Sequence, residues 1–421
     1  MFPSDILLEV FDFCHPEPSE TRDESIYNWW HGLVHVCRRW RQIIFTSSRW
    51  LNLQLLCTPK SPAGNLKDLD TWPQIPIAIK VEGLGNHLNP TQEDNLLTAF
   101  EHSDRVCSVT ANLLIQPQLE MVVKMMLKPF PALTYLRLSI KFETFDLRIL
   151  PSGFLGGPSP GLQELDLSCI SSPALPSILS STSNLVALHL RNFPMTNHIS
   201  TEAMAKHLAV MTKLESLTIE FNHYYMHHFP ALNVQVRARA TLPTLTQFQF
   251  QGPHWYLENL VAQLDTPRLF DLTVIILIPQ TRTQATTHPV VQQFPQLFPF
   301  IDRAEDIKLS HFGRACVEIH NFRSFVRFDN PQHPAYLTLG EGNYDHTGLD
   351  YDKFRPFWAM RPLLGQASAV ISSVRHLSIT RLDRRWTGWD IAGFLRLLRS
   401  FVVMCRPVSS SLTCLRPVLV L

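Results

Sequence analysis

Three histidines lie close together in the segment Asn222-His-Tyr-Tyr-Met-His-His228, and imidazole nitrogen is a common ligand of zinc. Such a site needs ligands that converge on one point, usually completed by carboxylates or thiolates. Only two acids, Glu215 and Glu220, are near in the sequence. We therefore interpret the segment as a polar surface loop and expect neither a metal site nor a bound cofactor.

Other patterns that carry catalysis do not occur in the sequence. It has no phosphate-binding loop, no Gly-x-Gly-x-x-Gly, no His-Glu-x-x-His and no Gly-x-Ser-x-Gly. The carboxylates Asp345, Asp350 and Asp352 lack the spacing of an EF-hand, so residues 338–356 are predicted to form a turn-rich loop. We expect that the chain is not an enzyme, and a hydrolase hidden among the histidines is a remote alternative.

The composition is apolar and nearly neutral, with 37 basic and 36 acidic residues among 421. Charged residues are 17% of the total, against about 25% in typical soluble proteins. This balance gives no reason to expect nucleic acid or a membrane surface as a partner. The length predicts two or three domains or one elongated array.

Several features favour an intracellular protein of the cytoplasm or nucleus. The eight cysteines form no Cys-x-x-Cys pair and are too scattered for a disulfide framework. Residues 1–14 contain no Lys or Arg, so no secretory signal is expected. The longest uncharged aliphatic run, Leu272–Ile278, is far too short to span a membrane.

The first fifty residues carry apolar side chains at helical spacing. Ser4 is a good N-cap, and Ile6, Leu7 and Val10 follow it on a broad apolar face. After an acidic insert at 15–24, a second stripe predicts one or two helices: Ile26, Trp29, Trp30, Leu33, Val36, Cys37, Trp40, Ile43 and Ile44. Residues 49–55 alternate like a strand. So few residues cannot bury these aromatics alone, so the stripe either packs onto the rest of the chain or docks a partner helix.

Two stretches of this segment resemble an F-box. They are Phe2-Pro-Ser-Asp-Ile-Leu-Leu-Glu-Val-Phe11 and Leu33-Val-His-Val-Cys-Arg-Arg-Trp-Arg41, followed by Trp50; Phe2 stands where the family usually has Leu. More narrowly, the chain resembles the F-box and leucine-rich-repeat proteins abundant in mushroom-forming fungi, strongly over about the first 80 residues and loosely to about residue 320. F-boxes bind the Skp adaptor of cullin–RING ubiquitin ligases. The resemblance implies adaptor contacts at Pro3, Ile6, Leu7, Val10, Leu33, Val36, Cys37 and Trp40.

A Leu-x-x-Leu-x-Leu pattern recurs through the middle of the chain. Its six clear matches begin at residues 133, 162, 185, 214, 245 and 269, and weaker matches lie at 106–111, 304–309 and 374–379. A Pro, Ser or Thr suited to a loop stands two positions before each clear match. Helical patterns fall between them at 91–102, 202–211 and 256–264. This alternation predicts an α/β fold in which an irregular leucine-rich-repeat solenoid has parallel strands on its concave face and helices or loops outside.

The strand period of two points the repeated aliphatics inward and the intervening side chains outward. The outward positions predict a target-binding surface that contains Tyr135, Arg137, Glu164, Asp166, His189, Thr218, Gln247 and Gln249. This mixed, weakly charged surface suits a protein or peptide better than phosphate, which calls for clustered Arg or Lys. In the family that the chain resembles, the repeats recruit the substrate. The alternative is a surface that is merely solvated.

These observations divide the chain into four parts. They are an F-box at 1–55, a Pro-rich linker and first strand at 56–95, an irregular leucine-rich-repeat domain at 96–380 and an atypical basic C-terminal cap or tail at 381–421. Within the tail, residues 390–404 predict an amphipathic helix. A repeat cap, a basic membrane-surface helix and an altered gene end are the three interpretations of this tail.

The resemblance implies a substrate-recruiting subunit of an SCF-type ubiquitin ligase. It would bind the Skp adaptor through the N-terminal helices and a protein target through the repeats. The alternative is a repeat-based interaction scaffold whose F-box engages no ligase.

Overall fold

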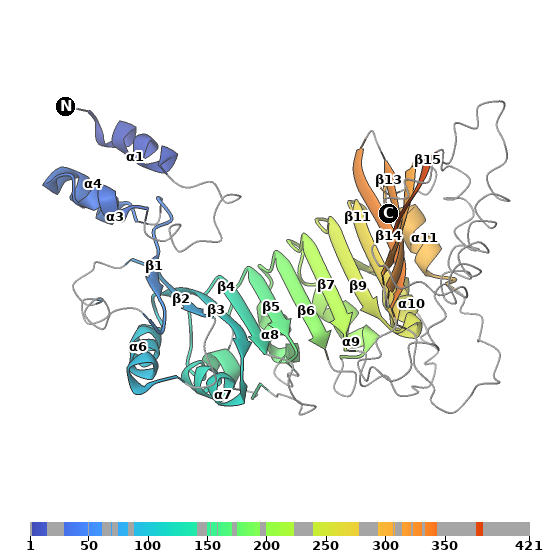
Figure 1. Ribbon diagram of the computed structural model, residues 1–421, viewed down its shortest axis with the longest axis horizontal. Helices are drawn as coiled ribbons and strands as arrows, with labels where there is room; N and C mark the ends of the chain where they lie inside the picture. The colour runs from blue at the N-terminus through green and yellow to red at the C-terminus, as the bar shows by residue number, and fades with distance from the viewer. Residues whose placement is uncertain are drawn as a thin grey trace. The chain divides into compact units, whose positions relative to one another are not determined.

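The computed structural model is an α/β structure with a mostly parallel sheet (Figure 1). The chain folds as two compact units, 1–185 and 186–421. The structure describes residues 2–14, 29–48, 50–60, 69, 75–82, 88–140, 150–151, 153–157, 159–170, 175–193, 199–222, 239–277, 294–305, 307, 314–320, 323–330, 333–342 and 376–381. The acidic insert, the histidine segment after Asn222 and the predicted helix at 390–404 lie outside these residues.

Three short helices begin the first unit: α1 (Ser4–Phe13), α3 (His31–Val34) and α4 (Arg38–Thr46). One side of α1 packs against α4, because Leu7 and Phe11 are one helical turn apart and both are buried. These helices share a core with residues that follow them in the chain. The core cluster consists of Leu7, Phe11, Trp30, Val34, Ile43, Ile44, Leu51, Leu53 and Ile75.

The strand predicted at 49–55 is wrong over most of its length. Residues 50–52 form a turn, Asn52 has a φ of 47°, and β1 (Leu55–Cys57) begins only at Leu55. Leu51 and Leu53 are both buried in the core cluster. Their alternation therefore reflects packing against the helices rather than pairing in a sheet.

In the first unit, β1 is followed by β2 (Ile77–Val81), β3 (Val106–Leu114), β4 (Tyr135–Ile140) and β5 (Glu164–Ser168), each parallel to the next. Val109, Leu136 and Leu165 pair in register and are buried, as the repeated pattern predicts. The connections contain α6 (Pro90–Glu101), α7 (Gln116–Met125) and the 3-10 turn η2 (Phe154–Gly156), and α8 (Leu175–Ser181) follows β5.

The predicted helix at 91–102 is confirmed as α6. Its start is encoded locally, since Asn89 and Gln92 form a reciprocal capping box, with hydrogen bonds of 2.9 and 3.0 Å, and Pro90 occupies the first helical position. Asn95, Leu96, Ala99 and Phe100 give it a buried face.

In the second unit, β6 (Ala187–Phe193), β7 (Ser216–Phe221), β9 (Gln247–Gly252), β11 (Asp271–Leu277) and β14 (His333–Gly342) are successively parallel. The predicted helices at 202–211 and 256–264 are confirmed as α9 (Thr201–Leu208) and α10 (His254–Ala262), with small shifts at their ends. A short ladder joins β8 (Ala240–Thr241) to β10 (Leu264–Asp265), and α11 (Leu297–Arg303) packs on α10.

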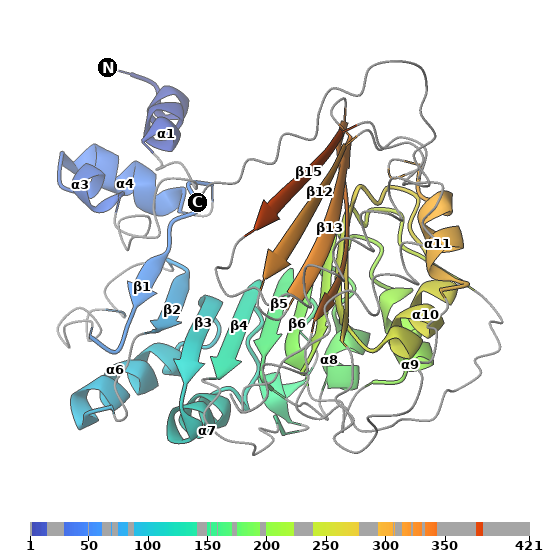
Figure 2. The ribbon, with the colours of Figure 1, turned by 45° about the vertical axis from the view of Figure 1, so that its right-hand side comes forward.

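The expectation of parallel strands throughout is wrong at the end of the second unit. There β13 (Arg323–Asn330) runs antiparallel to both β12 (Arg314–His320) and β14, while β15 (His376–Arg381) lies parallel to β12 (Figure 2). Only two residues separate β12 from β13 and β13 from β14. Such connections are too short for a parallel crossover, so these strands can pair only as hairpins.

The strand beside β11 is β14 rather than the weak match at 304–309. Ala304 and Ile307 lie in a bend and a turn after α11, and Leu309 lies outside the described residues. Leu337 and Leu339 instead align with Leu272 and Val274 and are buried beside them. Residues 338–342, predicted to begin a turn-rich loop, therefore belong to a strand.

Candidate functional site

The N-terminal helices carry an exposed apolar surface in addition to their buried core. Ile6 and Val10 of α1 are 44% and 48% exposed, and Val36, between α3 and α4, is 57% exposed. Phe2 and Phe13 at the two ends of α1 are also exposed. We call these five residues the helix surface. Spacings of three and four place Ile6, Val10 and Phe13 along one stripe of α1, away from Leu7 and Phe11.

Most residues predicted to bind the adaptor are accessible. Pro3, Ile6, Val10, Val36 and Cys37 are exposed, and Leu33 and Trp40 are half-buried. Leu7 is the exception, because it is only 6% exposed and belongs to the core cluster. Its predicted role as a surface contact is corrected to a core role. Phe2 and Phe13 were not among the predicted contacts, although Phe13 follows Val10 by three residues and thus extends the stripe.

Specific contacts hold this surface in place. The Phe11 and Trp40 rings meet edge to face at 4.8 Å, and Arg39 Nη2 donates to the Phe2 carbonyl at 2.6 Å. The Cys37 sulfur accepts the Trp40 N–H at 3.4 Å, so Cys37 also caps the start of α4. Burial, together with the neighbouring His35, lowers the pKa of His31, which favours the neutral imidazole at neutral pH.

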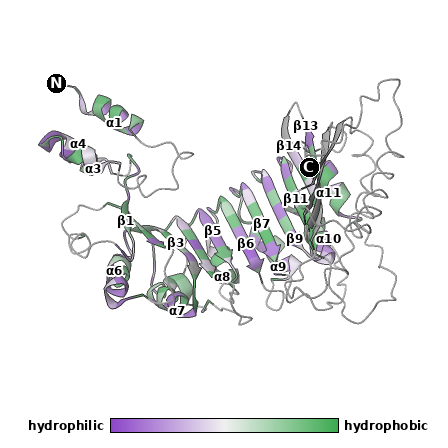
Figure 3. Ribbon diagram, viewed as in Figure 1, coloured by the Kyte–Doolittle hydropathy of each residue, from purple (hydrophilic) through white to green (hydrophobic). Residues whose placement is uncertain are grey.

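A second candidate is the polar side of the strands, whose alternation with the apolar side is visible in Figure 3. In the first unit, Arg137 Nε lies 2.8 Å from Asp166 Oδ2 on the adjacent strand, and the guanidinium lies 5.9 Å from the centre of the Tyr135 ring. Asp166 is buried, while Glu164 at the start of the same strand is exposed. On β2, Lys80 pairs with Glu82 at 3.0 Å, and Glu82 also accepts a hydrogen bond from Asn112.

The second unit has its own polar strand surface. His189 Nδ1 lies 2.9 Å from the Thr218 hydroxyl, and Gln249 Nε2 donates to Glu220 Oε1 at 2.8 Å. Gln247 is exposed. Burial raises the pKa of Asp271, and the Arg327 charge partly offsets the rise. We call the polar strand surface of each unit its sheet face.

Several residues of the sheet faces were not predicted from the sequence. Glu220 occupies the next outward position after Thr218. Extending each predicted repeat strand by two residues would have identified it. Tyr336 and Thr338 lie on β14, where no repeat match was found. Arg327 pairs with Thr338 across the antiparallel ladder, so only the hairpin reveals its place.

A threonine hydroxyl hydrogen-bonded to a histidine has the two groups of a nucleophile–base pair. Thr218, however, is only 4% exposed, so its hydroxyl is closed to a substrate. No group of three or more His, Cys, Asp or Glu that could hold a metal occurs in the part of the chain that the structure describes. The described residues of the sheet faces present side-chain hydrogen-bonding groups such as Gln247 and Gln249.

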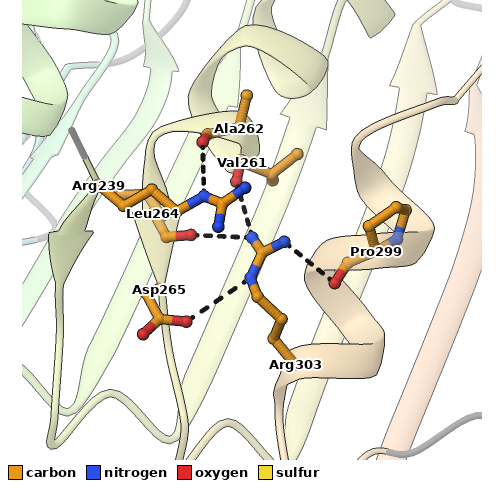
Figure 4. Close-up of polar contacts among 7 residues, drawn as sticks. All are labelled: Arg239, Val261, Ala262, Leu264, Asp265, Pro299 and Arg303. Carbon is orange, nitrogen blue, oxygen red and sulfur yellow. Dashed lines mark hydrogen bonds and ion pairs between the residues drawn. The ribbon is translucent and has the colours of Figure 1, made fainter. Parts of the chain in front are cut away.

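Two arginines converge on the C-terminal end of α10 (Figure 4). Arg239 Nε donates to the Ala262 carbonyl, and Arg303 Nη2 donates to the carbonyls of Val261 and Leu264 at 3.5 and 3.1 Å. Arg303 Nε lies 3.6 Å from an Asp265 oxygen. The Val261 and Ala262 carbonyls belong to the last turn of α10, and the Leu264 carbonyl lies just beyond it in β10, so the two arginines cap this end of the helix.

A second contact between α10 and α11 caps the start of α11. The buried Glu258 carboxylate of α10 accepts the backbone N–H groups of Gln296 and Leu297, at 2.7 and 3.1 Å, where α11 begins. Each helix thus caps the other, and we assign this cluster to the stability of the second unit.

No protein-family model matches the chain, and neither does any curated protein. None of the described helices is long and apolar enough to cross a bilayer.

Proposed function

We propose that the chain is a substrate-recruiting F-box subunit of an SCF-type cullin–RING ubiquitin ligase. Its helix surface would bind the Skp adaptor, and its sheet faces would bind a protein target. Catalysis would belong to other subunits, and this chain would contribute proximity and orientation. Such a role lies inside the cell, in the cytoplasm or nucleus, and calls for neither a nucleic-acid nor a membrane partner.

The observation that carries the proposal is the apolar character of α1 on two sides. Leu7 and Phe11 already give this helix a buried stripe, which is enough to attach it to α4. Ile6 and Val10 add nothing to that core and are about half exposed. A second apolar stripe on α1, together with the exposed Val36, has the composition of a docking surface for a partner helix.

We further propose that the strands form an irregular leucine-rich-repeat solenoid. Successive parallel pairing, with Leu217 aligned between Leu188 and Phe248, supports this assignment, and so do the helices between strands. The antiparallel β12–β14 segment would then be the atypical end that repeat arrays commonly carry.

The sheet faces support a protein or peptide target. Two pairs of their charged groups neutralise each other within the face, Arg137 with Asp166 and Lys80 with Glu82. Hydroxyl and amide groups occupy much of the remainder, including Thr110, Thr273 and Gln247. Such groups match the neutral donors and acceptors of a polypeptide.

Co-expression with a Skp adaptor tests the proposal. The wild-type chain is expected to co-purify with the adaptor, and Val10→Asp and Val36→Asp are expected to abolish the complex, because each buries a charge in an apolar contact. Leu97→Asp is the matched control, since Leu97 of α6 is 45% exposed and lies outside the helix surface. Leu7→Asp is unsuitable because Leu7 is buried.

A wild-type chain that shows no measurable association, or Val10→Asp and Val36→Asp proteins that bind as well as wild type, would refute the ligase role. The chain would then be a repeat-based scaffold that engages no ligase.

A further inference from the structure

Residues 58–76 form the connector between β1 and β2, two paired strands of the first unit. Its described residues are 58–60, 69 and 75–76. Ile75 near its end is fully buried in the core cluster of the helices, beside Trp30, Leu51 and Leu53. Two residues later, Ile77 begins β2. The last part of this connector therefore touches the helices and the sheet at once.

Arg105, in the turn between α6 and β3, forms hydrogen bonds to the connector. Its Nε and Nη2 atoms donate to the Ile75 carbonyl at 3.3 and 3.0 Å, and Nη1 donates to the Leu69 carbonyl at 2.9 Å. The Arg105 carbonyl in turn accepts the Ile77 N–H at 2.9 Å. One residue thus holds two points of the connector and the first residue of β2.

The connector has a second anchor on α6. The Asn95 side chain, only 5% exposed, donates to the Pro59 carbonyl at 2.9 Å. The connection from β1 to β2, whose Ile75 lies in the core cluster of the helices, is therefore held near its beginning by Asn95 and near its end by Arg105. A flexible linker would leave these carbonyls to water.

We propose that Arg105 is a positioning residue that locks the N-terminal helices to the strands of the first unit. The value of this lock rests on the proposed ligase function, because a target bound to the strands would keep one orientation relative to the adaptor. The fork of the guanidinium suits the task, since it reaches two separate carbonyls at once, whereas the single ammonium of lysine is a point donor.

A distance measurement between the two parts tests the lock without an adaptor or target. Spin labels are placed on cysteines introduced at Gln42 of α4 and Lys124 of α7, both exposed, in a full-length chain whose accessible native cysteines are serine. The otherwise unaltered chain is expected to give one narrow distance peak. Arg105→Ala is expected to lose that peak and give a broad distribution.

Amide exchange gives a second readout. The N–H groups of Leu55 and Ile77, bonded to Pro76 and Arg105, are expected to exchange about tenfold faster in Arg105→Ala, because hydrogen bonds to a charged group are lost nearby. Arg105→Lys is expected to broaden the distance peak while leaving the fold intact, and it serves if Arg105→Ala fails to fold. Arg239→Ala, which removes an arginine–carbonyl bond in the second unit, is the matched control and should keep the narrow peak.

Narrow peaks in both Arg105 variants, even with lowered thermal stability, would reduce Arg105 to an ordinary stabilising residue. A broad peak in the parent chain would overturn the lock outright. Because these measurements involve no adaptor, a failed capture experiment would leave their outcome unchanged.

Discussion

Arg137 and Asp166 face one another across adjacent parallel strands, with Nε 2.8 Å from Oδ2. The two ends of this pair differ in exposure, since the Arg137 side chain is 38% exposed and that of Asp166 is 5% exposed. The arginine covers the carboxylate and supplies the charge that makes its burial tolerable. An outward position of the repeat strand has thereby become part of the interior.

Removing Arg137 is therefore expected to destabilise the first unit. Arg137→Ala should lower the free energy of unfolding by about 1–2 kcal/mol. This is at the low end of the cost of leaving a buried carboxylate unpaired, because water reaches the vacated site. Urea denaturation measures the loss, and the double variant Arg137→Ala/Asp166→Ala should lose less than the sum of the single variants. Glu164→Ala, at an exposed position of the same strand, should stay within about 0.5 kcal/mol of wild type. Equal losses in Arg137→Ala and Glu164→Ala would contradict the pairing.

Neighbouring residues of α1 should have separable roles. Leu7→Ala is expected to cost about 2–4 kcal/mol, because it opens a cavity in the core cluster, and to accelerate amide exchange in α1 and α4. Ile6→Ala should leave that exchange nearly unchanged while weakening capture of a Skp adaptor. The reverse pattern would mean that the two sides of α1 have been assigned wrongly.

Gly252 is expected not to tolerate substitution even by alanine. A Cβ atom there would lie 2.5 Å from a Phe221 ring carbon and 2.9 Å from a Phe250 ring carbon. The Phe221 ring is buried against Tyr256, with ring centres 4.7 Å apart, and has little room to move. Gly252→Ala should therefore cost about 1–3 kcal/mol in thermal or urea unfolding. Gly153→Ala, where a Cβ meets nothing within 4 Å, is the control and should be nearly neutral.

Glu258 gives the second unit a specific pH dependence. Burial raises its pKa from 4.5 to about 7, although the N–H groups of Gln296 and Leu297 oppose the rise. The folded chain thus binds this proton more tightly than the unfolded chain. The resulting stability is fully present below pH 4.5 and is lost as the pH rises through about 7.

Denaturation of wild type and Glu258→Gln across this range measures the effect. The stability of wild type relative to the variant is expected to fall from about pH 4.5 to about pH 7 and then to level off. His254, whose pKa is lowered by burial, contributes an opposite slope to both proteins, so it largely cancels in the difference. A difference that does not vary with pH would place the Glu258 pKa near its ordinary value.

The repeat strands were predictable because their buried residues recur at local spacing, as Leu136, Leu165 and Leu217 do. The β12–β14 hairpins were not, since antiparallel pairing depends on partners that no repeat spacing marks. Leu7 shows a different gap between sequence and structure. A helix that is apolar on two sides does not reveal from its own residues which side the rest of the chain covers. Asp166 shows a third gap between sequence and structure. A side chain that points outward from a strand is not exposed when a long neighbouring side chain, here that of Arg137, lies over it.

The pairing of β11 with β14 has a consequence for the growing polypeptide on the ribosome. Most earlier strands pair with the strand that precedes them, so each can dock as it emerges. Asp271 of β11, by contrast, pairs with Tyr336, which is synthesised 65 residues later. During that interval one edge of β11, with the aliphatic run Val274-Ile-Ile-Leu277, has no pairing strand from β14. An open aliphatic edge invites pairing with another chain. Synthesis of this protein should therefore be most vulnerable to misassembly between the appearance of β11 and that of β14.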